Sequence, residues 1–271
     1  MGNIFANKKP AVTTEVEDDF IGGGGVLSTD IYPATIKYAY VGKAQNSDAR
    51  NLTLCLKVNG LEINRQIWMT NRNGDVTYTD KKTKEEKNLP GYNQVNGLCM
   101  LLASKEVGDM DVEEKQLSLY DYESKKEIPQ AVDCFVELHG LNLQVAIQEQ
   151  TVDKTEKNEA SGEYEPTGET RNVNEFIKFF PEDKLVTISE VAHFVKSLGG
   201  DFEEVLQGGD IGKAISKMEE DGAYATTWLE KNRGKAYDRS TGKKEGKSFG
   251  GGKAASGGGS EKKAKASLFD D

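Results

Sequence analysis

Aromatic rings and positive charges are interleaved in one part of the chain, between Arg65 and Tyr92. A single strand of nucleic acid binds where cations follow its phosphates and aromatic side chains stack on its bases. Both kinds of group are present here, namely Arg65, Trp68, Arg72, Tyr78, Lys81, Lys82, Lys84, Lys87 and Tyr92. The same residues also fit a Trp68 ring buried in the core and a solvated turn over 81–87, so both interpretations stay open.

A second and weaker cluster lies later in the chain and consists of Lys154, Lys157, Tyr164, Arg171 and Lys178. Lys37 and Tyr40 add a cation and a ring in an early strand-like run. Groups of this kind in one groove would stack on bases and neutralise phosphates. The predicted nucleic-acid contacts are therefore Lys37, Tyr40, Arg65, Trp68, Arg72, Tyr78, Lys81, Lys82, Lys84, Lys87, Tyr92, Lys154, Lys157 and Arg171.

Side chains with the spacing of a catalytic site are scarce. The two histidines, His139 and His193, have no Cys or His partner at a spacing typical of metal ligands. The stretch from Gly208 to Ala214 resembles a phosphate-binding loop only faintly, because it is one residue short and Ala214 replaces the hydroxyl that binds magnesium. We therefore predict no enzyme, no catalytic residue, no metal and no cofactor. A metal-dependent nuclease remains an alternative, since it needs only carboxylates that converge in the fold.

The charge of the chain is unevenly distributed. The formal net charge is −10, whereas nucleic-acid-binding domains usually carry a basic excess. From Glu230 onward, eleven Lys and Arg face six Asp and Glu, so the preceding residues carry a net charge of −15. Any nucleic-acid contact by the acidic part must therefore come from a local basic groove.

Three scattered cysteines, Cys55, Cys99 and Cys134, lie among apolar residues, which predicts buried thiols in a reducing compartment. The sequence contains no run of about 20 apolar residues that would cross a bilayer. The first residues lack the apolar stretch of a signal peptide. These features predict a cytoplasmic protein without a membrane contact.

The pattern of elements predicts a mainly β fold with α-helices. Apolar residues alternate over 52–58, and the hairpin signal Asn59-Gly60 and a second turn signal, Asn73-Gly74, predict an antiparallel meander. A helical pattern follows over 93–107, and strand patterns resume over 116–122, 131–138 and 141–150. This order suits an OB-fold-like five-stranded antiparallel barrel over 26–182, whose strand face binds oligonucleotides. We expect a flexible arm over 1–25, a small helical appendage over 183–232, and a disordered Gly/Lys-rich linker with an acidic tip over 233–271.

Four segments together resemble the single-stranded DNA-binding proteins of tailed bacteriophages. They are Thr29-Asp30-Ile31-Tyr32-Pro33-Ala34-Thr35-Ile36-Lys37, Tyr78-Thr79-Asp80-Lys81-Lys82-Thr83-Lys84, Leu89-Pro90-Gly91-Tyr92 and Thr167-Gly168-Glu169-Thr170-Arg171-Asn172. The similarity spans about residues 1–235. It implies an OB-fold core that coats single strands during phage replication and recombination in the host cell cytoplasm.

The last residues, Leu268, Phe269, Asp270 and Asp271, are similar to the acidic, Phe-containing tips of such proteins. The resemblance implies that this tip recruits replication, recombination or transcription proteins of the phage or its host. It departs from the bacterial form, in which Phe is the last residue. A recombination or annealing mediator and an RNA-binding regulator remain alternatives, and the oligomeric state stays open.

Overall fold

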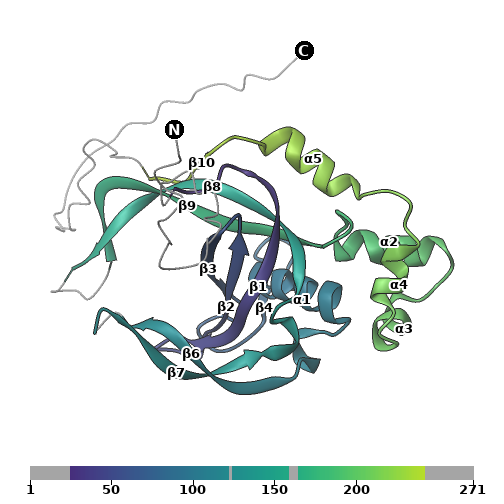
Figure 1. The fold of residues 1–271 in the computed structure, drawn as a ribbon, viewed down its shortest axis with the longest axis horizontal. Coiled ribbons are helices and arrows are strands. Elements are labelled where there is room, and N and C mark those ends of the chain that lie inside the picture. The colour runs from purple at the N-terminus through teal and green to yellow at the C-terminus, as the bar shows by residue number, and fades with distance from the viewer. Residues whose placement is uncertain (1–24, 122–123, 159–163, 242–271) are drawn as a thin grey trace, which may run out of the picture.

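The computed structural model describes residues 25–121, 124–158 and 164–241, and this part of the chain is mainly β with added helices, as predicted. Figure 1 shows the helices gathered at one end of the strands. The strands are β1 Asp30–Lys43, β2 Arg50–Val58, β3 Leu61–Trp68, β4 Thr77–Thr79, β5 Glu86–Asn88, β6 Val112–Asp121, β7 Lys126–Phe135, β8 Asn142–Lys157, β9 Tyr164–Pro181 and β10 Tyr237–Asp238. The helices are α1 Pro90–Ala103, α2 Ile188–Ser197, α3 Phe202–Gln207, α4 Ile211–Ser216 and α5 Ala223–Asn232, with 3₁₀ turns η1 Val107–Asp109 and η2 Val136–Leu138.

Eight strands form one sheet in which β1 is shared between several partners. One edge of β1 pairs with β2, and β2 continues to β3 through the predicted turn at Asn59 and Gly60. The other edge pairs with β8 over Asp30 to Thr35 and with β7 at Tyr40 and Val41. The hairpins β6–β7 and β8–β9 therefore leave β1 separately, and they curve away on either side of β1–β3 (Figure 1).

The sequence predicts an OB-fold-like five-stranded barrel, but the strands do not close into one in the described part of the chain, and the sheet is open. Closure would require β3 to pair with β9, but no backbone ladder joins these two strands in the described part of the chain. Side chains meet there instead. Arg65 of β3 donates to the carbonyl of Asn174 of β9, and the Asn174 amide bonds the backbone N–H and carbonyl of Leu27 at 2.8 and 2.7 Å. We call this contact between β3 and β9 the seam.

The residues that follow β3 also depart from the predicted meander. β4 pairs with β5 in a separate two-stranded sheet rather than with β3. The chain then enters α1 at Pro90, a residue suited to the first helical turn because its fixed φ is helical. Gly91 comes so close to the Trp68 carbonyl that a Cβ there would collide with it, which explains the glycine.

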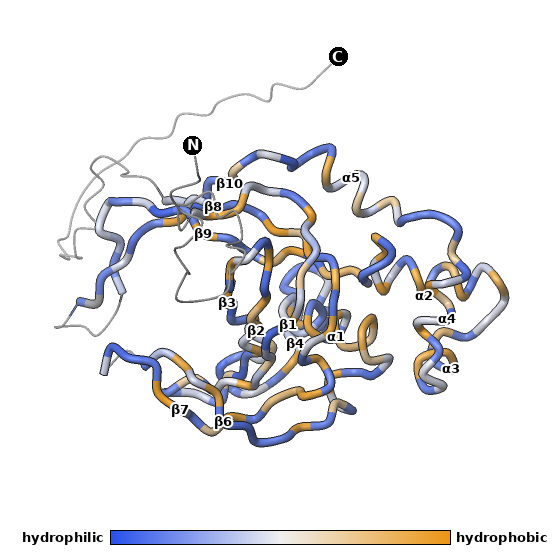
Figure 2. Tube along the Cα trace, in the orientation of Figure 1, coloured by the Kyte–Doolittle hydropathy of each residue, from blue (hydrophilic) through white to orange (hydrophobic). Residues whose placement is uncertain are grey.

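The main core lies between one face of β1–β3 and the elements that cover it. Its members from the strands include Ile36, Leu52, Leu54, Leu56 and Ile67. Val95 and Leu98 of α1, with Phe176 and Phe179 of β9, pack against them. Figure 2 shows that hydrophilic residues predominate instead at the outer ends of the two hairpins.

Helices α2–α5 follow β9, in the region for which the sequence predicts a helical appendage over 183–232. A capping box between Thr187 and Glu190 starts α2, and a small separate core joins α2, α3 and α4. Trp228 of α5 packs against Phe180 and Ala146 of the sheet.

The predicted start of the linker at 233 is too early, because the chain stays bound to the sheet as far as Thr241. Thr29 donates to the Lys235 carbonyl at 2.6 Å, and β10 pairs in parallel with β8 at Gln150 and Thr151. The Thr241 hydroxyl donates to Asp153 at 2.6 Å. The sequence of this segment gave no strand signal, because hydrogen bonds of its backbone and polar side chains hold it, and these leave no alternating apolar pattern.

Candidate nucleic-acid interface

The face of β1–β3 turned away from the core carries polar and aromatic side chains in rows across the strands. Tyr38 of β1 lies opposite Cys55 of β2, which lies opposite Asn64 of β3. The next two rows are Tyr40–Thr53–Gln66 and Gly42–Asn51–Trp68. Successive side chains of a strand point to opposite faces, so this face is the complement of the apolar core face.

A groove of about 460 Å³ runs along this face and is bounded by both hairpins. Its floor is made by β1–β3, one wall by Leu119 and Tyr120 of β6, and the other by Arg171 of β9. Arg171 also lines a second hollow of about 610 Å³ on the β8–β9 hairpin, together with Lys154 and Tyr164. Arg171 is therefore a lining residue that the two hollows share. The residues that line the first one, which we call the groove, are Tyr38, Tyr40, Thr53, Asn64, Arg65, Gln66, Leu119, Tyr120 and Arg171.

Three tyrosine rings reach the groove. The ring centroids of Tyr38 and Tyr40 are 5.9 Å apart and the planes are tilted by 39°. The Tyr38 hydroxyl donates to Asn64 Oδ1 at 2.8 Å, which fixes this ring across the sheet. Burial raises the pKa of Tyr38 well above its usual value, so it remains a neutral phenol. Tyr120 is 53 % exposed on the opposite wall. The rings thus present aromatic surface at a hollow of the sheet.

The charge in the groove is positive and comes from two arginines, Arg65 and Arg171. None of the described residues that line it carries a carboxylate. Arg171 is exposed and makes no ion pair within the described part of the chain. Lys154, in the second hollow, is by contrast paired with Glu169 at 2.8 Å, and this contact lowers the Glu169 pKa. Arg171 is therefore the cation most available to an anionic ligand here.

Arg65 belongs to the groove lining but is also engaged at the seam. Besides its bond to the Asn174 carbonyl, it donates to the Asn64 carbonyl at 2.8 Å. Glu175 Oε2 is 3.9 Å from Arg65 Nε. Burial lowers the pKa of Arg65 and raises that of Glu175, because both charges lose solvent at this position.

Of the predicted contact residues, the structure brings Tyr40, Arg65 and Arg171 together in the groove and places Lys154 beside them. The Arg65 to Tyr92 cluster does not form one surface. Tyr78 lies on the β4–β5 hairpin, and its Lys87 neighbour is paired with Asp80 at 3.1 Å. The other predicted cations there, Lys81, Lys82 and Lys84, are exposed, as is Arg72 before the hairpin.

Other predicted contacts lie elsewhere. Lys37 is paired with Glu62 at 2.7 Å. Tyr92 is partly buried, packs against the main core and is not among the described residues that line the groove. Lys178 lies 5.4 Å from the ring centre of Tyr224 in α5, on the side of the helices.

Trp68 is 44 % exposed on the third row of the groove face, which excludes the alternative of a core tryptophan. It lies on the same face as Tyr40 without lining the groove itself. The Lys157 side chain and the tip residues Leu268, Phe269, Asp270 and Asp271 lie outside the described residues.

Sequence reasoning missed Tyr38, Asn64, Gln66 and Tyr120 as groove residues. A signal existed for Tyr38, because Tyr38 and Tyr40 are two residues apart in a predicted strand and must share a face. Asn64 and Gln66 follow the same rule on β3. Tyr120 gave no such signal, since its position on the groove depends on how the β6–β7 hairpin folds back.

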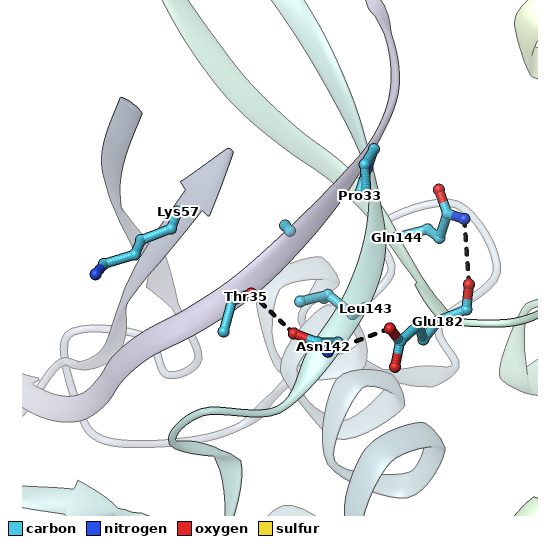
Figure 3. Close-up of a pocket in the computed structure, with 8 residues that line it drawn as sticks. Pro33, Thr35, Lys57, Asn142, Leu143, Gln144 and Glu182 are labelled. Carbon is cyan, nitrogen blue, oxygen red and sulfur yellow. Dashed lines mark hydrogen bonds between the residues drawn. The ribbon is translucent and has the colours of Figure 1, made fainter. Parts of the chain in front are cut away.

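Another hollow of about 410 Å³ lies where β1 passes from β8 toward β7, and Figure 3 shows its lining. Thr35 donates to Asn142 Oδ1 at 2.8 Å, and Asn142 donates to Glu182 at 3.1 Å. Gln144 donates to the Glu182 carbonyl at 3.1 Å. These polar groups bond to one another, so this hollow offers a ligand fewer unused partners than the groove does.

Within the described residues, no three His, Cys, Asp or Glu side chains are grouped as metal ligands. No helix in the same residues has the length and apolar character needed to cross a membrane. Comparison with known proteins adds no assignment, since no family model and no curated protein matches the chain.

Proposed function

We propose that this protein binds single-stranded DNA with little sequence preference, in the groove between the β6–β7 and β8–β9 hairpins. The observation that carries the proposal is the groove's composition: three tyrosines and two arginines without a carboxylate in the described lining, on a chain with a net charge of −10. Rings supply stacking surface for any base, and arginine supplies charge for phosphates. An acidic protein binds a polyanion only where such a local surface exists.

In this mechanism the bases and the phosphates of the DNA contact different side chains. Tyr40 and Tyr120 stack on bases, each base contributing roughly 1–3 kcal/mol. Tyr38 supports Tyr40 from the neighbouring position at 5.9 Å. Arg171 binds a phosphate, and the release of counterions makes the affinity fall with salt. Tyr164 would extend the path along the β8–β9 hairpin, where Lys154 is paired with Glu169 and Glu156 also lines the hollow.

The finer fold assignment is part of the same proposal. An OB fold is a partly open five-stranded barrel that binds oligonucleotides on one strand face. Strands β1, β2, β3, β8 and β9 are candidates for these five, with α1 after β3 and the seam as the opening. The groove would then occupy the ligand face of that fold, and the β6–β7 hairpin would be an addition to it.

The wider role follows from the sequence resemblance. It favours a protein that coats single strands during phage replication and recombination in the host cell cytoplasm. The tip at Leu268, Phe269, Asp270 and Asp271 would recruit partner proteins. Deleting these four residues tests this part, because a recruiting tip predicts impaired phage replication with DNA binding retained.

The central test is fluorescence anisotropy of a labelled oligo-dT at two salt concentrations. We expect the wild-type chain to bind at low salt and to bind more weakly at high salt. The double variant Tyr40→Ala/Arg171→Ala should lose most of that affinity. A labelled RNA of equal length and a duplex of equal length, run in parallel, distinguish the RNA-binding alternative and general polyanion binding. Absence of oligo-dT binding by the wild-type chain at low salt would refute the proposal.

A further inference from the structure

Arg65 occupies a position on β3 that normally faces the core. It lies opposite Leu54, and its alternate neighbours Ile63 and Ile67 are both buried in the main core. Side chains two residues apart on a strand share a face. Arg65 is therefore an arginine on the core side of β3, at the edge of the sheet. Asn64 and Gln66 lie on the opposite side of the strand and form part of the groove floor.

The Arg65 guanidinium is used for contacts within the protein. Nε donates to the Asn174 carbonyl on β9, and a terminal nitrogen donates to the Asn64 carbonyl on β3 at 2.8 Å. One planar side chain thus joins the two strand edges that lack a backbone ladder. Asn174 in turn holds Leu27 through its amide, so the seam is a continuous set of hydrogen bonds.

This arrangement bears directly on Arg171. Arg171 precedes Asn174 by three residues on the same strand, and it lines both the groove and the second hollow. A bond that holds Asn174 against β3 also fixes where Arg171 stands over the groove floor. Without this bond, β9 would be held here by its backbone pairing with β8, in which Arg171 lies opposite Val152.

We propose that Arg65 is a positioning residue that acts through Arg171, and that Arg171 rather than Arg65 binds the phosphate. This inference rests on the proposed single-stranded DNA binding. It assigns different roles to the two arginines: Arg171 contacts the DNA, and Arg65 holds Arg171 in position. It also predicts that the two side chains are energetically coupled, although they are far apart in sequence.

A double-mutant cycle on the full chain tests this division with Arg65→Ala, Arg171→Ala and the double variant. The measurements are the affinity for labelled oligo-dT and its dependence on salt. Arg171→Ala should weaken binding about tenfold and reduce the salt slope by about 1. Arg65→Ala should produce a similar loss, and the double variant should bind no more weakly than Arg171→Ala alone.

If Arg65 were itself a phosphate ligand, the two losses would multiply, and the salt slope of the double variant would fall by about 2. That result overturns the inference but leaves the proposed function intact. Failure of the wild-type chain to bind oligo-dT would instead overturn both. Thermal unfolding of each variant identifies any loss that comes from global unfolding.

Arg65→Lys provides the test if Arg65→Ala does not fold. Lysine keeps the charge but replaces the guanidinium fork with a single nitrogen, so it cannot bond both carbonyls in the same way. We expect Arg65→Lys to weaken binding without adding to the effect of Arg171→Ala. Wild-type affinity and salt slope in folded Arg65→Lys would contradict a positioning role.

Discussion

The two faces of β1–β3 are built from the same three strands but differ in almost every property. One face carries Ile36, Leu54 and Ile67 and is buried under α1 and β9. The other carries Tyr38, Tyr40 and Gln66 and is left as the floor of a groove. Adjacent residues such as Leu54 and Thr53 therefore lie on different faces, since Leu54 packs in the core and Thr53 lines the groove. The comparison predicts that substitutions on the two faces of one set of strands separate stability from the proposed ligand binding.

The largest effect is expected on the core face. Leu54→Ala removes a fully buried side chain and leaves a cavity, which should lower the free energy of unfolding by about 2–5 kcal/mol. Urea unfolding followed by circular dichroism measures this loss. Gln66→Ala, on the exposed face of the neighbouring strand, is the matched control and should stay within about 0.5 kcal/mol. Equal losses of unfolding free energy in the two variants would contradict the assignment of Leu54 to the core face and Gln66 to the exposed face.

The next effect concerns binding rather than stability. Tyr40→Ala should weaken oligo-dT binding by roughly 1–3 kcal/mol, because a stacking ring is lost. Its free energy of unfolding should change less than that of Leu54→Ala, since Tyr40 is only partly buried. Anisotropy titrations and urea unfolding of the same preparation give both values. An unchanged affinity would exclude Tyr40 as a stacking residue.

A smaller effect on DNA binding is expected when the cations of 81–87, which form the densest basic cluster in the sequence, are substituted. Tyr78→Ala/Lys82→Ala removes a ring and a charge from the β4–β5 hairpin, outside the groove lining. We expect the affinity for oligo-dT to change by less than about 0.5 kcal/mol, as for an ordinary surface substitution. A loss as large as that of Tyr40→Ala/Arg171→Ala would extend the interface to this hairpin.

The smallest effect is predicted for thiol reactivity in the native protein. Cys99 lies in the core, where burial raises its pKa to about 12, and Cys55 is buried on the groove face beneath Tyr38, with its pKa also raised. At pH 8 both thiols should stay protonated and react slowly with a maleimide. Tyr38→Ala should increase labelling of Cys55 and not of Cys99, as mass spectrometry of the labelled peptides can show. Equal labelling of both would indicate general unfolding.

The local part of this fold was predictable because alternation and turn residues act over short distances. The pattern over 52–58 and the turn at Asn59 and Gly60 were enough to predict the β2–β3 hairpin. The open seam was not, since it depends on an arginine at an inward position of β3 meeting a residue 109 positions later. β10 was missed because a strand of two residues is too short to give a periodic signal.

The candidate site shows the same limit. Tyr40 and Arg171 were identified by residue type, but sequence proximity grouped Arg65 with the lysines of 81–87. The fold separates them and places Arg65 with Arg171 in the lining of the groove instead. Tyr92 lies close to these lysines in the sequence, but its partly buried side chain packs against the main core.

The placement of the two tryptophans gives the protein a pair of built-in optical probes. Trp68 is 44 % exposed on the groove face, whereas Trp228 is 9 % exposed between α5 and the sheet. Water quenches and red-shifts indole emission more strongly at the first site than at the second. Emission from Trp68 should therefore respond to a ligand on β1–β3, and emission from Trp228 to detachment of the helices. The Trp228→Phe variant then reports a ligand through Trp68 alone, and the Trp68→Phe variant reports detachment of the helices through Trp228 alone. Neither measurement needs an added dye.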